Sequence, residues 1–402
     1  MGRAGYFPAS GGPLPNNSEE TRPGGNNNKR TGRHIVPTAR RRFLKLPLAL
    51  GAAGLLPQRA AAASPVKAAI DEYGPGNIKL SHRVPDDISD DDLLFLKQIG
   101  LRWARVNFAP ERSSFEDLRR THERFARYGL GIYSGVHYAY RSLEIQLGKP
   151  GRDKDIEAYQ TFLRDAGKLG IRIASYDFHP ANTYTTDHVE SPRGYTAREF
   201  KLSDFRAKVE KQRFEREYSA DEIWEYYTYF MKAVLPVAKE AGVMMALHPD
   251  DPPLAKMNGV AKVLVHYDGY RRAEEISNQI EGKGSPHWGL TFCVGTWSEG
   301  GDQMGKDVFE MIRDFGGRKK ILEIHFRSVT GPLPHFVETF PDEGYMDMYQ
   351  VMKGLREVRF DGMMVPDHVP RLVGDKGINR AGTAYCIAYM RALLRRANEE
   401  VG

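Results

Sequence analysis

Short apolar runs alternate with longer amphipathic segments through most of the chain. An unbroken apolar run is typical of a strand buried on both faces. Apolar positions with a 3.6-residue period, as at Ile156, Tyr159, Leu163 and Ala166, are typical of a helix. The pattern predicts eight strands, at residues 78–83, 101–108, 131–138, 171–178, 243–247, 288–293, 321–326 and 362–365. It predicts helices over residues 93–99, 115–128, 153–169, 220–241, 345–358 and 381–397.

This alternation indicates a parallel sheet. Eight repeats over roughly 320 residues favour an α/β fold closed into a (β/α)₈ TIM barrel. An open doubly wound sheet is the alternative, but no G-x-G-x-x-G or P-loop follows the first strand, which weakens its nucleotide-binding version. Residues 183–214 are polar, and we expect an irregular loop that covers the site, because long loops are uncommon unless they are functional.

The first 63 residues differ in composition from the rest. Residues 1–39 are rich in Gly, Pro, Asn and Arg and too poor in apolar residues to fold. Arg40, Arg41 and Arg42 then precede an apolar stretch that ends in small residues near Ser64. This resembles a twin-arginine export signal, and its apolar run is too short to span a bilayer. We therefore expect residues 64–402 to be the catalytic domain, exported to the periplasm or beyond by the twin-arginine machinery, or cytoplasmic if the leader is not used.

The basic balance of the chain, a net charge of +6, comes from this leader. Ten of the 58 Lys and Arg residues but only two of the 52 acids lie in residues 1–63, so the body holds 48 basic and 50 acidic residues. No basic stripe interleaved with aromatics is present to bind phosphates. We expect no nucleic-acid partner and no stable membrane span. The oligomeric state stays open, a homo-oligomer included. The two cysteines, Cys293 and Cys386, could pair, but they make no disulfide framework in a chain of this size.

Four successive late strands each end near a residue that can bind a metal: His248, Cys293, His325 and Asp367. In a parallel barrel these carboxyl ends meet at one mouth, where active sites are built. Two imidazoles, a thiolate and a carboxylate suit a divalent transition metal. A single strand histidine or a buried cysteine usually has no such role, and Cys386 fits that simpler explanation. Near the four, Asp250, Asp251 and His368 are candidates for acid–base work or for orienting the ligands.

Several segments resemble mannonate dehydratases, enzymes of the xylose-isomerase-like barrel class. The distinctive matches are Ala246–Pro253 (ALHPDDPP) and Gly289–Cys293 (GLTFC), supported by Ile324–Arg327 (IHFR) and Pro366–His368 (PDH). A looser match covers the middle of the chain, at residues 147–153 and 176–180. The resemblance extends from about residue 78 onward.

The resemblance implies dehydration of D-mannonate to 2-keto-3-deoxy-D-gluconate with Mn²⁺ or Fe²⁺. It implies His248, Cys293, His325 and Asp367 as metal ligands and His368 as a catalytic group. Asp250, which lies close to His248 in the sequence, is our second catalytic candidate. A metal polarises the carboxylate or hydroxyl of a sugar acid, and a histidine moves the proton. Arg327 is expected to bind the substrate carboxylate. Asp177 and His179 are further candidates for substrate binding.

The chain departs from the family pattern at positions expected to face the substrate. The family's Asp-Trp-Thr-Arg-Thr after the fourth strand is Asn182–Thr186 here, without the arginine. Val365 and Val369 flank the Pro-Asp-His segment in place of Arg and Gly, and a family tyrosine falls near Ile378, with Tyr385 a doubtful substitute. Two alternatives therefore stay open: a metal-dependent sugar isomerase or epimerase on the same barrel, and a non-catalytic exported relative.

Overall fold

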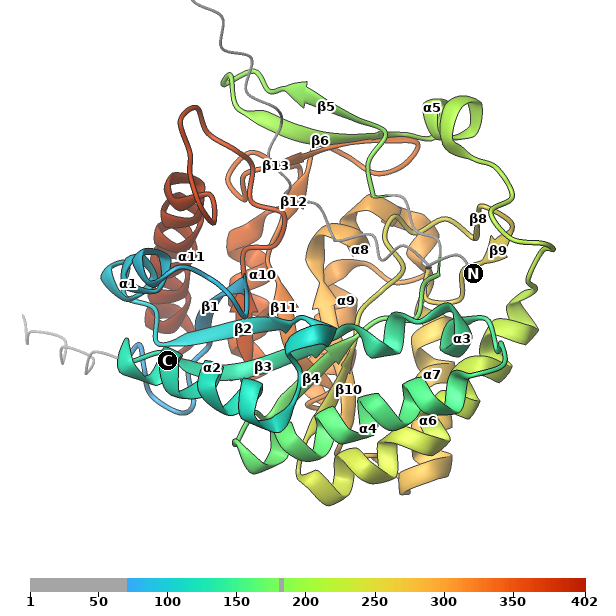
Figure 1. The fold of residues 1–402 in the computed structure, drawn as a ribbon. Coiled ribbons are helices and arrows are strands. Elements are labelled where there is room, and N and C mark those ends of the chain that lie inside the picture. Colours follow the sequence, from blue (N-terminus) through green and yellow to red (C-terminus); the bar gives the residue numbers. More distant parts are fainter. Residues whose placement is uncertain (1–70, 181–183) are drawn as a thin grey trace, which may run out of the picture. The chain divides into compact units, whose positions relative to one another are not determined.

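The computed structural model describes residues 71–180 and 184–402. The predicted leader and its boundary near Ser64 lie outside the described residues. Eight strands form a closed barrel in the order β1-β14-β11-β10-β7-β4-β3-β2. All eight coincide with predicted strands, and the TIM-barrel prediction is confirmed (Figure 1). Their bounds are β1 Lys79–Pro85, β2 Trp103–Phe108, β3 Gly131–His137, β4 Ile173–Tyr176, β7 Met244–Leu247, β10 Trp288–Cys293, β11 Ile321–His325 and β14 Met363–Val365.

Helices follow the barrel strands and bury their apolar faces against them (Figure 1). The longer ones are α1 Asp90–Gln98, α2 Phe115–Arg127, α4 Arg152–Lys168, α6 Ala220–Ala241, α7 Tyr267–Glu281, α10 Met348–Glu357 and α11 Arg380–Val401. Short helices are α3 Leu143–Gln146, α5 Leu202–Asp204, α8 Val294–Gly300 and α9 Val308–Met311. Single 3₁₀ or π turns cover Pro110–Arg112, Tyr138–Arg141, Phe205–Val209, Gly301–Met304 and Ile312–Gly316.

The two ends of helix α6 show how the sequence positions the strand that carries His248. Ser219 and Glu222 form a reciprocal capping box at its start. The helix ends at Gly242, whose φ of +67° is a left-handed conformation that glycine adopts without a Cβ penalty. The chain then reverses into β7, which pairs in parallel with both β4 and β10. His248 is thereby placed at the carboxyl end of the barrel.

A second sheet lies outside the barrel and corrects one prediction. Strands β5 (Asp187–Glu190), β6 (Thr196–Lys201), β12 (Ser328–Val329) and β13 (His335–Thr339) form a four-stranded sheet in the order β12-β13-β6-β5, which we call the outer sheet. The expectation of an irregular loop over residues 183–214 is wrong, because β5 and β6 lie within that range. The pairing of β6 with β13 joins segments more than 130 residues apart, so local sequence pattern did not reveal it. A small hairpin, β8 (Lys256–Met257) and β9 (Val260–Ala261), completes the strands.

The two cysteines do not pair. Cys293 and Cys386 are both buried free thiols. Cys386 packs with Tyr195, Ala197 and Phe340, as expected of a cysteine in an apolar core. Within the described part of the chain, no helix combines the length and apolar character needed to cross a membrane.

Candidate active site

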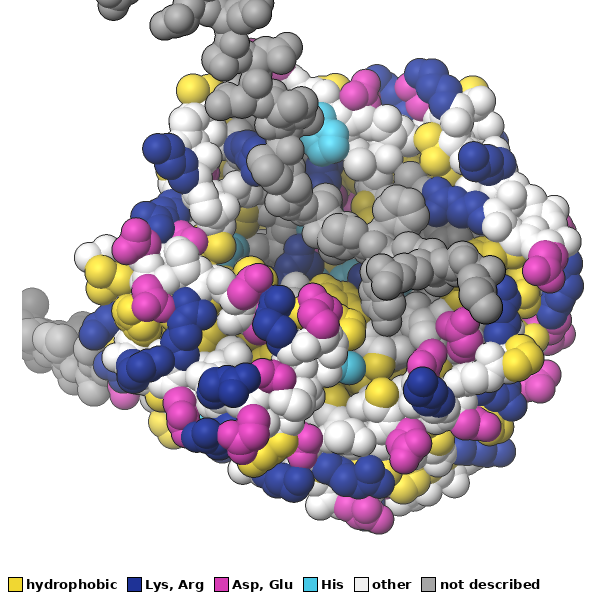
Figure 2. All heavy atoms as spheres, viewed as in Figure 1, with side chains coloured by type: hydrophobic (Ala, Val, Ile, Leu, Met, Phe, Trp, Pro, Cys, Tyr) yellow, Lys and Arg dark blue, Asp and Glu magenta, His cyan; other side chains and the backbone are white. Residues whose placement is uncertain are grey.

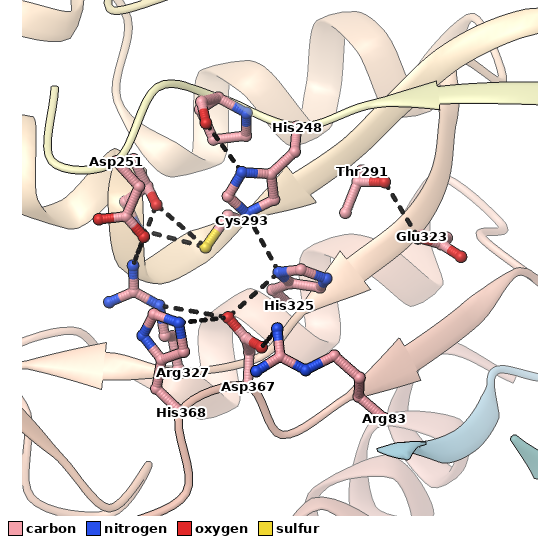
Figure 3. Close-up of polar contacts among 12 residues, drawn as sticks. Arg83, His248, Asp251, Thr291, Cys293, Glu323, His325, Arg327, Asp367 and His368 are labelled. Carbon is pink, nitrogen blue, oxygen red and sulfur yellow. Dashed lines mark hydrogen bonds and ion pairs between the residues drawn. The ribbon is translucent and has the colours of Figure 1, made fainter. Parts of the chain in front are cut away.

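Three of the predicted metal ligands come together at the carboxyl end of the barrel. Cys293 ends β10, and the β10–β11 register sets it beside His325 at the end of β11. His248 follows β7, the neighbour of β10 on its other side. Their ligand atoms all lie within 4.8 Å of one another (Figure 3). The fourth predicted ligand, Asp367, follows β14, and its Oδ2 lies 3.3 Å from His325 Nδ1.

The state of these side chains fits a transition metal. His248 Nδ1 lies 2.8 Å from the Pro249 carbonyl oxygen, so we assign the proton to Nδ1 and a lone pair to Nε2, which faces His325 Nδ1 at 3.2 Å. Burial lowers the pKa of His248 to about 4, which keeps the ring neutral at pH 7. The backbone N–H and the hydroxyl of Thr296 both point at Cys293 Sγ, at 3.4 and 3.2 Å, as suits a thiolate. Among the residues that the structure describes, none hydrogen-bonds to the buried His325 Nε2. A nitrogen- and sulfur-rich donor set of this kind suits Zn²⁺ or Fe²⁺ better than a hard cation such as Ca²⁺, and the carboxylate of Asp367 adds an oxygen donor of the type that Mn²⁺ prefers.

Asp367 forms ion pairs with groups on several sides of the site. Its Oδ1 lies 3.1 Å from Arg83 Nη1, a contact drawn in Figure 3. Burial would raise the pKa of Asp367, but His368, Arg83 and His325 hold it well below its usual range. Asp367 is therefore ionised at neutral pH, as a metal ligand must be.

His368 lies between two carboxylates. Its Nδ1 is 2.7 Å from Glu338 Oε1, and its Nε2 is 3.3 Å from Asp367 Oδ2. The backbone of His368 has a φ of +52°, a conformation that non-glycine residues rarely adopt and that occurs at functional sites. Glu338 comes from β13, so the outer sheet supplies a residue to the site. Sequence reasoning missed Glu338, because only the long-range pairing of β13 places it there.

Arg327 has a different environment from the one expected of a substrate-binding residue. Its side chain is 2% exposed. Nη2 donates to Asp251 at 2.8 Å and to Thr296 Oγ1 at 3.0 Å, and Nη1 binds Glu299. Both terminal nitrogens are therefore occupied by protein groups. Since Thr296 in turn points its hydroxyl at Cys293, Arg327 helps to position a candidate metal ligand.

Asp251 and Glu299 share the Arg327 guanidinium and differ in charge. Burial raises the pKa of Glu299 well above its usual range despite the nearby arginine, which favours its protonated form. Burial also acts to raise the pKa of Asp251, but Arg327 and a hydrogen bond from Glu299 lower it overall. The pair is thus favoured to hold one proton and one negative charge opposite the arginine.

Asp177 and His179 lie at the same mouth, after β4. His179 Nε2 is 3.2 Å from Asp177 Oδ1, and its ring centroid is 6.3 Å from that of His248. Asp177 also accepts hydrogen bonds from Tyr140 Oη at 3.0 Å and from Arg141 Nε at 2.8 Å. Burial alone would raise the pKa of Asp177, but Arg141 and His179 lower it. The ion pair of Arg141 with Asp177 was not expected from the sequence, because Arg141 belongs to a 3₁₀ turn with no motif.

Asp250 has its contacts with Leu264 and Lys262. It is fully buried, accepts a hydrogen bond from the Leu264 backbone N–H at 2.9 Å, and lies 3.7 Å from Lys262 Nζ. Burial lowers the pKa of Lys262 to about 8, and Lys262 also donates to the carbonyl oxygen of Pro180. These contacts indicate that Asp250 stabilises the local fold. The catalytic role expected from its sequence position would require Asp250 to reach the mouth of the barrel.

A closed (β/α)₈ barrel that gathers imidazole, thiol and carboxylate groups at the carboxyl ends of its strands has its candidate site where TIM-barrel enzymes have theirs. Solved structures of other proteins share the fold. An L-ribulose 3-epimerase aligns with a TM-score of 0.52 at 14% identity, over 80% of this chain and 96% of its own. At that identity the likeness shows the fold alone.

The particular family follows from closer matches. The family model for D-mannonate dehydratase (UxuA) matches residues 196–401. A mannonate dehydratase of Streptococcus suis is 32% identical over 259 residues, 58% of this chain and 68% of its own length. Mannonate dehydratase 2 of Halalkalibacterium halodurans is 30% identical over 58% of this chain and 72% of its own. The crystal structure of the enzyme from S. suis serotype 2 aligns with a TM-score of 0.71 at 28% identity, over 81% and 96% of the two chains. The chain belongs to the D-mannonate dehydratase family, a family of hydro-lyases.

Proposed function

We propose that the protein dehydrates D-mannonate to 2-keto-3-deoxy-D-gluconate with a resident Mn²⁺ or Fe²⁺. The observation that carries this proposal is the close group of His248, Cys293 and His325 donor atoms, in a chain of this family, at the mouth of the barrel. Asp367 would supply the fourth ligand. When bound, the metal acts as a Lewis acid on a substrate oxygen.

The substrate is an anion, and the arginines of the mouth are suited to bind it. The side chains of Arg83 and Arg141 are each 33% exposed, whereas that of Arg327 is 2% exposed. Arg83 and Arg141 are therefore our candidates for binding the sugar-acid carboxylate. Asp177 pairs with both Arg141 and His179. Asp177 and His179 are our candidates for binding the sugar hydroxyls. Figure 2 shows a hollow between the outer sheet, at the top of the view, and the barrel, with basic and histidine side chains visible inside it.

His368 is positioned to take the proton from the carbon next to the carboxylate. Glu338 fixes the Nδ1 side of its ring and stabilises the imidazolium that forms. The electron pair of the C–H bond then forms the double bond to the neighbouring carbon, whose hydroxyl leaves as water. The resulting enol tautomerises to the 2-keto acid. Asp250 takes no part in this account.

Product analysis of the full-length chain tests the proposal. With Mn²⁺ and D-mannonate, we expect a 2-keto-3-deoxy acid, detected by its semicarbazone absorbance and by mass spectrometry. His248→Ala is expected to lose metal and activity together, and the exposed His188→Ala on β5 serves as the matched control. Interconversion of neutral sugars without loss of water would support an isomerase or epimerase instead, and metal-dependent stability without turnover would support a non-catalytic relative.

We also propose that the leader directs export through the twin-arginine machinery. The support is compositional: an arginine pair, a short apolar run and small residues near Ser64. The double substitution Arg40→Lys and Arg41→Lys is expected to retain the protein in the cytoplasm on fractionation of the expressing cells. Unchanged export of the double variant would exclude this route.

A further inference from the structure

Six side chains form a closed ring of neighbours around the centre of the site. His248 Nε2 lies 3.2 Å from His325 Nδ1, which lies 3.3 Å from Asp367 Oδ2, which lies 3.3 Å from His368 Nε2. On the other side, the rings of His248 and His179 are 6.3 Å apart. The ring of Tyr184 closes the gap, with its centroid 6.0 Å from that of His179 and 6.4 Å from that of His368.

Tyr184 meets both imidazoles edge to face, at interplanar angles of 84° and 81°. The phenol therefore belongs to the wall of the site, opposite the candidate metal ligands. It is also close to the two partly exposed arginines. The pKa of Arg83 is raised first by Asp367 and also by Tyr184. Burial opposes a rise in the pKa of Arg141, but Asp177 and, in part, Tyr184 raise it overall.

The elimination needs a second group besides the base. Hydroxide is a poor leaving group, so the departing oxygen needs a proton as its bond to carbon breaks. Among the described residues of the ring, three are candidate metal ligands, His368 is the base, and His179 lies against Asp177. Tyr184 is the remaining member that carries an O–H, and Arg83 and Arg141 are placed to stabilise its phenolate.

We propose that Tyr184 is the proton donor to the leaving hydroxyl, a role that rests on the proposed dehydration. As His368 takes the proton from the carbon next to the carboxylate, the C–O bond of the neighbouring carbon breaks with its electron pair on oxygen. The phenol O–H transfers its proton to that oxygen, and water is released. The Tyr184 phenolate then takes a proton from solvent, and the His368 imidazolium releases its proton to solvent.

Two substrates separate this role from a positioning role. Tyr184→Phe is compared with wild type on D-mannonate and on 3-deoxy-3-fluoro-D-mannonate, whose fluoride leaves without being protonated. We expect kcat on D-mannonate to fall by about 100-fold or more, the usual contribution of a general acid. On the fluoro substrate, fluoride release is expected to stay within about threefold of wild type, because fluoride leaves without a proton and the phenol of Tyr184 then contributes nothing to the rate.

The matched control is Tyr195→Phe, which loses a phenol hydroxyl that binds Glu343 at 2.6 Å. It is expected to match wild type on both substrates. Equal losses on both substrates in Tyr184→Phe, or no loss on either, would overturn the proposal. The two failures are distinguishable. If the wild type releases no keto acid from D-mannonate, the proposed function is contradicted, whereas the role of Tyr184 is judged only from the rates of Tyr184→Phe relative to wild type.

Discussion

Replacing Arg327 by methionine tests whether this residue stabilises the site or binds the substrate. The guanidinium donates to Asp251 at 2.8 Å and to Thr296 at 3.0 Å, binds Glu299, and lies 3.8 Å from Glu338 and 3.9 Å from Asp367. All of these groups are buried. Methionine keeps most of the side-chain length but removes the charge and every donor.

The expected cost follows from what is left behind. Removing one partner of a buried ion pair leaves an uncompensated charge and costs about 3–5 kcal/mol. Asp251 is the charged acid nearest the guanidinium, because burial favours the protonated form of Glu299, while the ionised Asp367 lies farther away, at 3.9 Å. We therefore expect Arg327→Met to lower the free energy of unfolding by about 3–5 kcal/mol. Adding Asp251→Asn to the variant removes the stranded charge, and we expect the double variant to recover part of the loss.

Urea unfolding followed by circular dichroism, on metal-free protein without substrate, measures this effect directly. Arg119→Met on α2, which breaks solvent-exposed pairs with Glu116 and Glu123, is the control and is expected to unfold as wild type does. A loss below about 1 kcal/mol in Arg327→Met, together with a raised KM for the sugar acid, would refute the positioning role and return Arg327 to substrate binding.

Three further predictions concern charge, pH and metal. Glu299→Gln is expected to change the unfolding free energy by less than about 1 kcal/mol in the same urea assay, because burial already favours the protonated form of Glu299. Burial lowers the pKa of His137 to about 4, below that of an unfolded histidine, so acidification protonates the unfolded chain first. Between about pH 6.5 and pH 4 we expect unfolding titrations to show a loss of up to about 3 kcal/mol from this group, reduced in His137→Leu. Mn²⁺ at about 100 times its dissociation constant should stabilise the wild type by about 2.7 kcal/mol in thermal unfolding, and the gain should be absent in His325→Ala.

The barrel was predictable because its signals are local. Strands such as β7 and β10 are short, mostly apolar runs that lead into a polar residue. Helix α6 has an apolar period and a cap at each end, at Ser219 and Gly242. The positions of His248, Cys293 and His325 followed from a general property of parallel barrels, that strand ends converge. The structure brings these three together as predicted.

The features that the sequence did not reveal depend on contacts between distant segments. The outer sheet pairs β6 with β13, and this pairing delivers Glu338 to His368. From its sequence position after a strand, Arg327 was expected to be accessible to substrate. It is buried among acids because residues of α8 and β13 pack around it. Asp250 shows the same limit, since the backbone turn toward Leu264 decides where its side chain points.

We propose that the mouth of the barrel holds a metal with which the protein dehydrates a sugar acid. The most direct test measures bound metal by mass spectrometry and keto-acid formation from D-mannonate on the same full-length sample, before chelation, after chelation and after addition of Mn²⁺ or Fe²⁺. We expect metal and activity to be lost together and restored together, and neither to be restored in a Cys293→Ala variant. Full activity in the chelated, metal-free protein would contradict the account.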